Sequence, residues 1–247
     1  MKITEKIAKS ILSPSQVFDY VINPYVGCQH ACIYCYAKFM KRFTGHKEAW
    51  GDFVDIKMNS PDLLKKEIIK KKKGTIWISG VCDPYQPIER KYKITEKCLE
   101  ILAEFDWPVV IQTKSPLILR DIEILKEIRN IEVGFSIGTA DDLVRKAFEP
   151  KAPGINKRID ALEELRNAGI NTYAMIAPIL PMAEKLIELL SGKIEYVILD
   201  RMNYSYGNPI YEKHGWQDKK CDKYFVEVGK IIARECKNNG IEYRSVY

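Results

Sequence analysis

Apolar and β-branched runs alternate with amphipathic stretches along most of the chain. The runs that predict strands cover residues 17–22, 75–79, 109–112, 132–137, 172–177 and 196–199. Between them, the apolar spacing predicts helices over residues 61–71, 95–105, 116–128, 156–168 and 184–190, with a further helical segment from residue 141. Ser60 suits the N-cap of the first helix and Pro61 its first turn, while Gly169 closes the helix over residues 156–168. The pattern is a strand–helix unit repeated six times.

This alternation predicts a parallel α/β sheet with helices packed outside it, because parallel strands need crossover connections. Six units in under 200 residues fit either an open doubly wound sheet or an incomplete barrel, and periodicity does not choose between them. In both folds the functional residues gather at the C-terminal ends of the strands. We expect one domain over residues 1–247, with a core over about residues 17–200. A C-terminal extension over about residues 201–247 is expected to contain a loop (204–215), a helix (223–237) and a strand (241–244).

The composition of the chain limits the classes of protein to which it can belong. At 247 residues and 46% hydrophobic, the chain is long enough for one sizeable core. It has no run of about 18 apolar residues, so no membrane span is expected. The first nine residues lack the apolar core of a secretory signal, and the seven cysteines are an odd number, which together predict a reducing, cytoplasmic location. The net charge of +6 is modest, and its lysine-rich source at residues 65–73 is typical of a solvated helix end.

Three of the cysteines, Cys28, Cys32 and Cys35, lie within eight residues in a C-x3-C-x2-C arrangement. Thiolate is a soft ligand that suits iron–sulfur clusters, zinc or copper(I). Structural zinc sites usually add a second, distant pair of ligands, which this sequence lacks. A four-iron cluster normally takes four cysteines, so three would leave one iron open for chemistry. The alternatives are a zinc site completed by another cysteine or by a histidine (His30, His46 or His214) and three unrelated core cysteines.

With Tyr34 just before the last cysteine, this motif resembles the hallmark of the radical S-adenosylmethionine (radical SAM) enzymes. The resemblance implies that Cys28, Cys32 and Cys35 ligate a 4Fe-4S cluster whose free iron binds S-adenosylmethionine (SAM). It further implies reductive cleavage of SAM to a 5'-deoxyadenosyl radical that abstracts a hydrogen atom from substrate. An external electron donor of the ferredoxin or flavodoxin type would supply the electron. The resemblance also favours a partial (β/α)6 barrel of the TIM type.

Polar residues follow several predicted strands, at positions where a purely structural core would have apolar residues. They include Asp83-Pro84-Tyr85-Gln86-Pro87 after the second strand, Thr113-Lys114-Ser115 after the third, and Glu149-Pro150 further on. These segments resemble the spore photoproduct lyase-like branch of the superfamily, whose members are often described as DNA repair photolyases. The resemblance runs from about residue 23 to residue 181.

The resemblance assigns cofactor contacts to several of these residues. Tyr34 is expected to pack against the adenine side of SAM, and Lys114 and Ser136 to contact its methionine and ribose portions. A cation suits a carboxylate and a hydroxyl suits a ribose, in agreement with both assignments. The alternatives are a surface lysine and a small residue packed in the barrel. Arg158 either anchors a carboxylate of the cofactor or pairs with Glu149.

Two residues are expected to act on hydrogen transfer. Tyr36 stands where spore photoproduct lyase has a tyrosine involved in radical propagation, unless it is a packing aromatic. The lyase's hydrogen-donating cysteine matches Gly80, which we expect to face the cofactor, with Cys82 two residues later. Residues two apart on a strand share a face, so Cys82 is either a displaced hydrogen donor or an inert thiol. Asp83 and Glu89 bind the cofactor's ammonium or the substrate, unless they belong to turns.

The resulting hypothesis is a radical SAM enzyme that acts on nucleic acid or a related substrate. Modification of a peptide or metabolite is the alternative within the enzyme class. A non-catalytic iron–sulfur or zinc protein is the alternative outside it, although such a protein does not need polar strand ends at Lys114 and Ser136. The short N-terminus and the displaced cysteine argue against a true spore photoproduct lyase. The oligomeric state is left open by the sequence.

Overall fold

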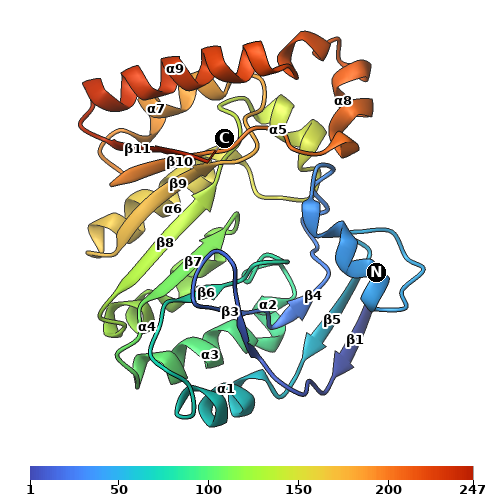
Figure 1. Ribbon diagram of the computed structural model, residues 1–247, viewed down its shortest axis with the longest axis vertical. Helices are drawn as coiled ribbons and strands as arrows, with labels where there is room; N and C mark the ends of the chain where they lie inside the picture. Colours follow the sequence, from blue (N-terminus) through green and yellow to red (C-terminus); the bar gives the residue numbers. More distant parts are fainter. Residues whose placement is uncertain (247) are drawn as a thin grey trace.

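An eight-stranded, curved sheet forms the frame of the protein in our computed structural model, which describes residues 1–246 (Figure 1). The strand order is β11-β10-β9-β8-β7-β6-β3-β2. Strands from β3 to β11 run parallel to their neighbours, whereas β2 pairs antiparallel with β3 at the edge. The strands are β2 (Leu12–Pro14), β3 (Tyr20–Ile22), β6 (Ile76–Ile78), β7 (Val109–Thr113), β8 (Ile131–Ser136), β9 (Asn171–Ile176), β10 (Tyr196–Leu199) and β11 (Glu242–Ser245).

The six predicted strands are β3, β6, β7, β8, β9 and β10, and they lie side by side in chain order. Such an order results when successive crossovers of one hand add each strand beside the last. The fold is therefore the expected α/β partial barrel, and the C-terminal helix and strand extend it. Strand β11 adds to β10 in parallel after the long helix α9 (Asp222–Asn238).

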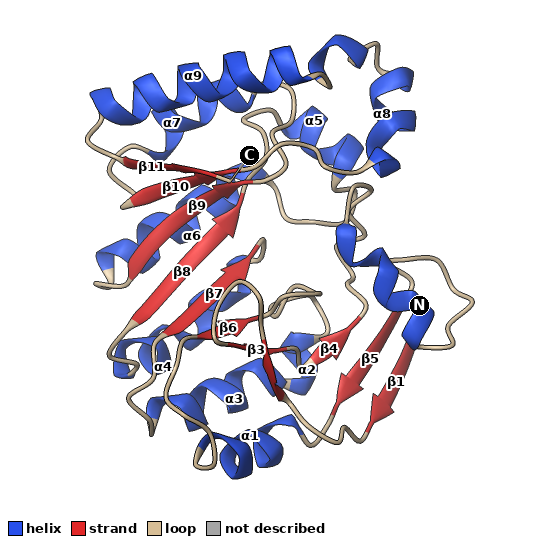
Figure 2. Ribbon diagram, viewed as in Figure 1, coloured by secondary structure: helices blue, strands red, loops and turns tan. Residues whose placement is uncertain are grey.

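Helices cover the outer side of the sheet (Figure 2). In α6 (Ile155–Asn167), the buried residues Ile155, Ile159 and Leu162 recur at helical spacing and face the sheet. None of the described helices is both long enough and apolar enough to cross a membrane. The other helices are α1 (Ser60–Ile68), α2 (Glu89–Tyr92), α3 (Ile94–Ala103), α4 (Ile122–Glu127), α5 (Asp142–Phe148), α7 (Leu186–Leu190) and α8 (Asn208–Lys213).

The inner face of the sheet is filled at one end and open at the other. Side chains alternate along a strand, so Val109 and Ile111 join the main core while Val110 packs on the inner face. There, the rings of Tyr173 and Tyr196 stack with centroids 4.9 Å apart. Gly134 makes room for them, because a Cβ at this position would lie 2.1 Å from the Tyr173 ring. Polar residues replace the rings toward the C-terminal ends of the strands, where a cavity begins.

A second sheet of three strands carries the cysteine motif. Its order is β1 (Lys2–Lys6), β5 (Phe53–Lys57) and β4 (Tyr25–Val26), with β1 parallel and β4 antiparallel to β5. The sequence pattern does not predict this sheet, because β1 is almost entirely polar and exposed and β4 has only two residues. In Figure 1 the small sheet stands beside the large one, near the N-terminus.

Several predicted elements differ from the observed ones. The first strand begins at residue 20 instead of residue 17, since Ser15 and Asp19 form a backbone-bonded turn before it. Asn59 is the N-cap of α1, and Ser60 lies inside the helix. The helix over 116–128 is divided into the 3-10 helix η2 (Pro116–Asp121) and α4. The predicted loop over 204–215 contains η4 (Ser205–Gly207) and α8, because Pro209 fits the first turn of a helix.

Candidate active site

The cysteine motif lies in the loop between β4 and the 3-10 helix η1 (Tyr36–Phe43). Two distant segments hold this loop in place. Gln86 donates from Nε2 to the Gly27 carbonyl at 3.1 Å and accepts from the Gln29 N–H at 2.9 Å. The Ile33 N–H donates to the Phe148 carbonyl at 2.8 Å. The loop is thus fixed by side-chain and backbone contacts to other parts of the barrel.

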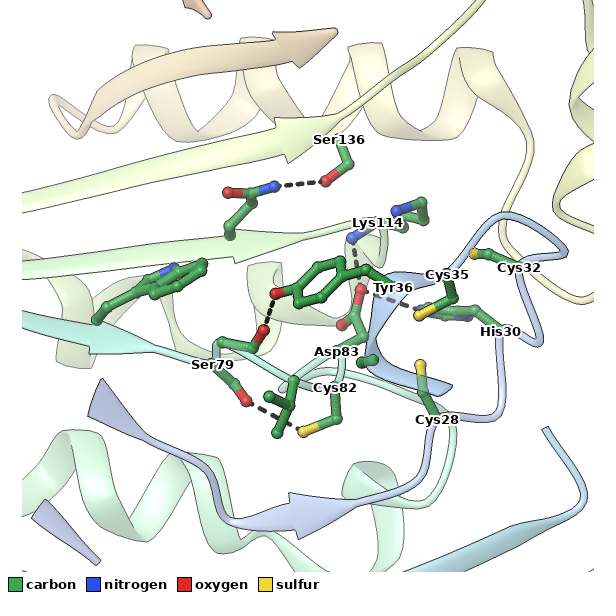
Figure 3. A pocket seen from close by; sticks show the side chains of 15 residues that line it. Cys28, His30, Cys32, Cys35, Tyr36, Ser79, Cys82, Asp83, Lys114 and Ser136 are labelled. Carbon is green, nitrogen blue, oxygen red and sulfur yellow. Dashed lines mark hydrogen bonds and ion pairs between the residues drawn. The ribbon is translucent and has the colours of Figure 1, made fainter. Parts of the chain in front are cut away.

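Two cavities meet at the C-terminal ends of the strands. The first, of about 110 Å³, is lined by Cys28, Cys32 and Cys35, and the second, of about 190 Å³, extends from it toward the loop after β10. Figure 3 shows the three cysteines along one side of the first cavity, with Tyr36 reaching across it. All predicted site residues except Arg158 and Glu89 line these cavities: Cys28, Cys32, Tyr34, Cys35, Tyr36, Gly80, Cys82, Asp83, Lys114 and Ser136.

The three thiols are buried next to one another. Burial raises the pKa of Cys28, and the neighbouring Asp83, Cys32 and Cys35 raise it further. Burial likewise raises the pKa of Cys32 to about 12, although the Lys114 cation opposes the shift. Thiolates at these positions would need a compensating positive charge. A bound iron cluster supplies such a charge, so the donor set and its surroundings fit a thiolate-bound iron–sulfur group.

Each of the three histidines has another partner in the protein, and His30 Nε2 lies 3.2 Å from its partner Asp83. His46 contacts Asp55 at 2.8 Å and Glu48 at 3.1 Å, and His214 stacks on Trp216. Within residues 1–246, no group of three or more His, Cys, Asp and Glu side chains is arranged to hold a single metal ion. A tetrahedral zinc ion needs its ligands to converge on one point, whereas a cluster spreads its thiolates over separate irons.

A buried ionic network lies behind the cysteines and includes Lys114. Glu149, which is 1% exposed, accepts from Arg158 Nη2 at 2.5 Å and from the Tyr34 hydroxyl. The Lys114 Nζ atom lies 3.9 Å from Glu149 Oε1 and also faces both cavities. Burial alone lowers the pKa of Lys114, but Cys32 and Glu149 beside it raise the pKa above its usual range. Lys114 is therefore a cation held at the cavity wall.

Arg158 is fully buried and belongs to this network instead of lining a cavity. It donates to the Ser136 carbonyl at 2.8 Å and to the Pro153 carbonyl as well as to Glu149. The structure therefore shows the second of the two expected arrangements, the pair with Glu149. The sequence left both open because it does not tell which way a helical arginine points.

Asp83 links the cysteine loop to the end of β7. Its carboxylate accepts from the Thr113 hydroxyl at 2.7 Å and from the Lys114 N–H at 2.7 Å, and it lies 3.2 Å from His30 Nε2. Burial opposes ionisation, but His30, Thr113 and the Lys114 N–H more than offset it and lower the pKa of Asp83 to about 2. Asp83 is thus an ionised structural link that also faces the first cavity.

This pKa predicts an acid-dependent cost for Asp83→Asn. The pKa of Asp83 is lower in the folded protein than in the unfolded chain, so its ionised carboxylate stabilises the fold. This stabilisation is complete above about pH 4 and is lost as the pH falls through about 2. We expect the loss of unfolding free energy caused by the substitution to be larger at pH 7 than at pH 3, measured by urea unfolding. Asp52→Asn, which breaks an exposed pair with Lys151, should cost little at either pH. An equal cost of Asp83→Asn at both pH values would contradict this reading.

The loop after β6 is shaped by Asn23. Its Oδ1 atom accepts from the Ser79 hydroxyl at 2.8 Å and from the N–H groups of Gly80 and Val81 at 2.9 and 3.1 Å. The Tyr36 hydroxyl donates to the Gly80 carbonyl, which brings η1 against this loop. The loop thereby presents Gly80 and the residues that follow it to the first cavity.

The Cys82 thiol lies in the same loop. Its Sγ atom is 3.0 Å from Ser79 Oγ and donates to the Tyr25 carbonyl at 3.3 Å. Burial raises the pKa of Cys82 to about 12, so the thiol keeps its hydrogen near neutral pH. Whether Cys82 gives up that hydrogen to a radical stays a prediction.

Glu89 stabilises the N-terminus of helix α3. It is fully buried and accepts from the N–H groups of Ile94, Thr95 and Glu96, the first turn of α3, and from Arg120. A carboxylate at a helix N-terminus satisfies otherwise unpaired donors. Glu89 lines neither cavity, which places it away from any cofactor or substrate there.

Sequence reasoning missed three residues that shape the site. Asn23 and Gln86 position the loops, and Gln112 lines both cavities and donates to Ser136 Oγ at 2.9 Å. Gln112 had a usable signal, since it is a polar residue inside an otherwise apolar strand run. Gln86 stood in a segment that carries the family resemblance, but neither it nor Asn23 had a signal for holding a loop, because their partners are more than 50 residues away.

The barrel and its cysteine-lined cavity define the class of protein. The family model of the Radical SAM superfamily matches residues 22–190, and the chain belongs to this superfamily. A protein of Methanocaldococcus jannaschii is 42% identical over 196 residues, which cover 77% of this chain and 70% of the relative. The radical SAM Nα-GlyT isomerase of Pseudomonas phage M6 is 25% identical over 161 residues, which cover 64% of this chain and 33% of the isomerase.

Solved structures share the fold. Spore photoproduct lyase complexed with dinucleoside spore photoproduct matches with a TM-score of 0.74 at 16% identity, covering 99% of this chain and 82% of the lyase. A lyase variant with bound AdoMet and the same photoproduct matches with a TM-score of 0.74 at 15% identity, with the same coverage. Streptococcus suis SuiB bound to its precursor peptide SuiA matches with a TM-score of 0.62 at 16% identity, covering 92% of this chain and 48% of SuiB. The chain is thus a radical SAM enzyme by family, with a spore photoproduct lyase-like structure.

Proposed function

We propose that this enzyme holds a 4Fe-4S cluster on Cys28, Cys32 and Cys35 and uses it to cleave SAM reductively. When bound, the cluster and SAM supply a 5'-deoxyadenosyl radical that abstracts a hydrogen atom from substrate. The observation that carries the proposal is that three neighbouring thiols and the Lys114 cation line one pair of adjoining cavities. An electron donor of the ferredoxin or flavodoxin type would supply the electron from outside the chain.

The residues around the cavities suit the parts of SAM. Lys114 offers a cation to the carboxylate, and its position is fixed by Glu149. Ser136 and Gln112 offer hydrogen-bonding groups for ribose hydroxyls. Tyr34 lines the second cavity with its hydroxyl engaged by Glu149, which leaves the ring for packing against adenine. These assignments rest on chemistry and position.

Tyr36 and Cys82 are the candidates for handling hydrogen atoms. Both line the first cavity, and each holds its hydrogen in a bond to a backbone carbonyl, Gly80 for Tyr36 and Tyr25 for Cys82. Burial raises the pKa of both groups to about 12, so each retains its hydrogen at neutral pH. They are therefore suited to donate a hydrogen atom to a radical formed in the cavity.

We propose nucleic acid as the substrate class. The support is the likeness to spore photoproduct lyase in complex with a dinucleoside photoproduct. The likeness to SuiB bound to a precursor peptide keeps peptide modification as the second candidate, but it covers less than half of SuiB and has the lower TM-score. The displaced position of Cys82 relative to Gly80 argues for a reaction other than spore photoproduct repair.

Formation of 5'-deoxyadenosine tests the proposed function. The protein is reconstituted anaerobically with iron and sulfide, reduced with dithionite and supplied with SAM. We expect wild type to form 5'-deoxyadenosine and Cys32→Ala to form essentially none. Cys221→Ala removes an exposed cysteine outside the cavities and should leave the product unchanged. A Cys32→Ala variant that forms as much product as wild type would refute the proposal.

A further inference from the structure

Exposed aromatic side chains gather at one place on the surface. Within residues 1–246, the exposed aromatic residues are Tyr36, Phe39, Phe43, Tyr204 and Tyr206. The first three belong to η1, whereas Tyr204 lies in the loop after β10 and Tyr206 in the 3-10 helix η4 that follows it. We call residues 36–43 and 201–206 together the aromatic rim. Five exposed rings confined to two segments are not a scatter of single apolar residues, so the rim requires an explanation.

The two halves of the rim meet beside the second cavity. The rings of Tyr204 and Tyr206 stack with centroids 5.8 Å apart and planes 9° apart, and they are 48% and 43% exposed. Lys38 Nζ lies 4.9 Å from the Tyr206 ring centroid and joins η1 to this pair. Tyr36 and Tyr204 line the second cavity. The exposed rings therefore continue outward from the cavity wall.

The rim is also basic. The η1 segment carries Lys38, Lys41 and Arg42 and no acidic residue. Among the described residues, no carboxylate forms an ion pair with any of these three cations. Arg42 lies over the rings of Phe39 and Phe43, at 6.0 and 5.8 Å from their centroids. Each of the three cations donates to a backbone carbonyl and has no carboxylate partner, so it keeps its charge and further donors for a phosphate beside the exposed rings.

From this arrangement we infer that the aromatic rim binds a single-stranded segment of nucleic acid and delivers it to the cavity. Bases expose their faces for stacking only where they are unpaired, and stacking on aromatic rings beside a basic groove is how proteins hold single strands. A duplex offers phosphates but hides the faces of its bases. Binding to a lipid surface does not require two parallel, stacked rings. The inference deepens the proposed function, on which it rests, by naming the form of nucleic acid and the residues that hold it.

Binding of short oligonucleotides to the cluster-loaded protein tests the inference. The probe is a fluorescein-labelled 12-nucleotide oligothymidylate, followed by fluorescence anisotropy, with a duplex of equal length and anionic phosphatidylserine vesicles as competitors. We expect the single strand to bind at least about tenfold more tightly than the duplex and the vesicles not to displace it. Phe43→Ala combined with Tyr206→Ala should weaken single-strand binding by about tenfold or more, since each substitution removes a ring on which a base would stack.

The charge contribution is tested separately. Lys41→Gln combined with Arg42→Gln should reduce the slope of log affinity against log salt by about 1.4, which corresponds to two phosphate contacts. Lys70→Gln combined with Lys72→Gln removes the same charge from the segment that follows α1 and should leave the slope unchanged. Duplex binding as tight as single-strand binding, displacement by vesicles, or unchanged affinity of the ring variant would overturn the inference.

A failure of the inference differs from a failure of the proposed function. Phe43 and Tyr206 line neither cavity, so their double variant should form 5'-deoxyadenosine from SAM at the wild-type rate when no nucleic acid is present. Cys32-dependent formation of 5'-deoxyadenosine without oligonucleotide binding would refute the binding role of the aromatic rim but not the proposed cleavage of SAM. Oligonucleotide binding without 5'-deoxyadenosine would refute the proposed function, and with it the delivery of the strand to a reaction.

Discussion

Glu149→Gln is expected to lower the free energy of unfolding by about 3–5 kcal/mol. Glu149 is the carboxylate shared by Arg158, Lys114 and the Tyr34 hydroxyl. Burial raises its pKa, but Arg158 and Lys114 more than compensate and hold the pKa below its usual range. A neutral amide would leave the fully buried Arg158 cation without a counter-charge. The loss is large because the Arg158 side chain is fully buried and cannot reach water.

Urea unfolding, at matched cluster content, measures this loss as a shift of the midpoint with an unchanged slope. Glu123→Gln is the matched control, because Glu123 pairs with Lys126 on an exposed helix surface and should cost less than about 1 kcal/mol. The double variant Glu149→Gln, Arg158→Met should be more stable than Glu149→Gln alone, since it removes the stranded cation. A cost of Glu149→Gln no larger than that of Glu123→Gln would show that the network is not a buried ionic unit.

Lys114→Met is expected to weaken SAM binding by about 10- to 100-fold, because a hydrogen bond to a charged group contributes about 1.5–3 kcal/mol. Lys114 is the cation that faces both cavities. Methionine keeps the length and the apolar stem of lysine, so the change removes the charge with little change of volume. The dissociation constant is measured by equilibrium dialysis of labelled SAM against the cluster-loaded protein.

Lys151→Gln is the control, because Lys151 pairs with Asp52 on the surface and lines neither cavity. Iron and sulfide content must match between the variants, so that a lost cluster is not mistaken for lost cofactor affinity. If Lys114→Met bound SAM as tightly as Lys151→Gln, the assignment of Lys114 to the SAM carboxylate would be wrong.

The large sheet was predictable and the small one was not. Each of the six barrel strands is an apolar run buried on at least one face, as Val133 and Phe135 of β8 illustrate, and that burial leaves a pattern in the sequence. Strand β1 reads Lys-Ile-Thr-Glu-Lys and is stabilised through backbone pairing with β5. Backbone pairing does not depend on side-chain identity, so it leaves no periodic signal. The helix α8 was missed because Gly, Asn and Pro suggest a loop when their neighbours are unknown.

The part of the candidate site that the sequence predicts best is the one in which several residues of the same type lie close together in one motif. The spacing of the cysteines predicted that they lie together, and the strand end and the family resemblance predicted Lys114 near them, as the lining of the first cavity shows. A role of Lys114 in binding SAM stays a prediction. Arg158 was harder, because a buried arginine serves a carboxylate of either the cofactor or the protein. Asn23 and Gln86 were beyond reach, since their partners come from loops that the fold alone brings together. Prediction failed where a role depends on contacts between distant segments.

The anchoring of the cysteine loop bears on the order in which the protein matures. The Ile33 N–H that fixes this loop binds the carbonyl of Phe148, a residue 115 positions later in the chain. Contacts of such sequence separation form late in folding, because a long segment must close before they add stability. Domains fold as units during or after synthesis, so the thiols emerge from the ribosome long before their final surroundings exist. Insertion of an iron–sulfur group at its final position is therefore expected only after at least the first 150 residues have been made and folded.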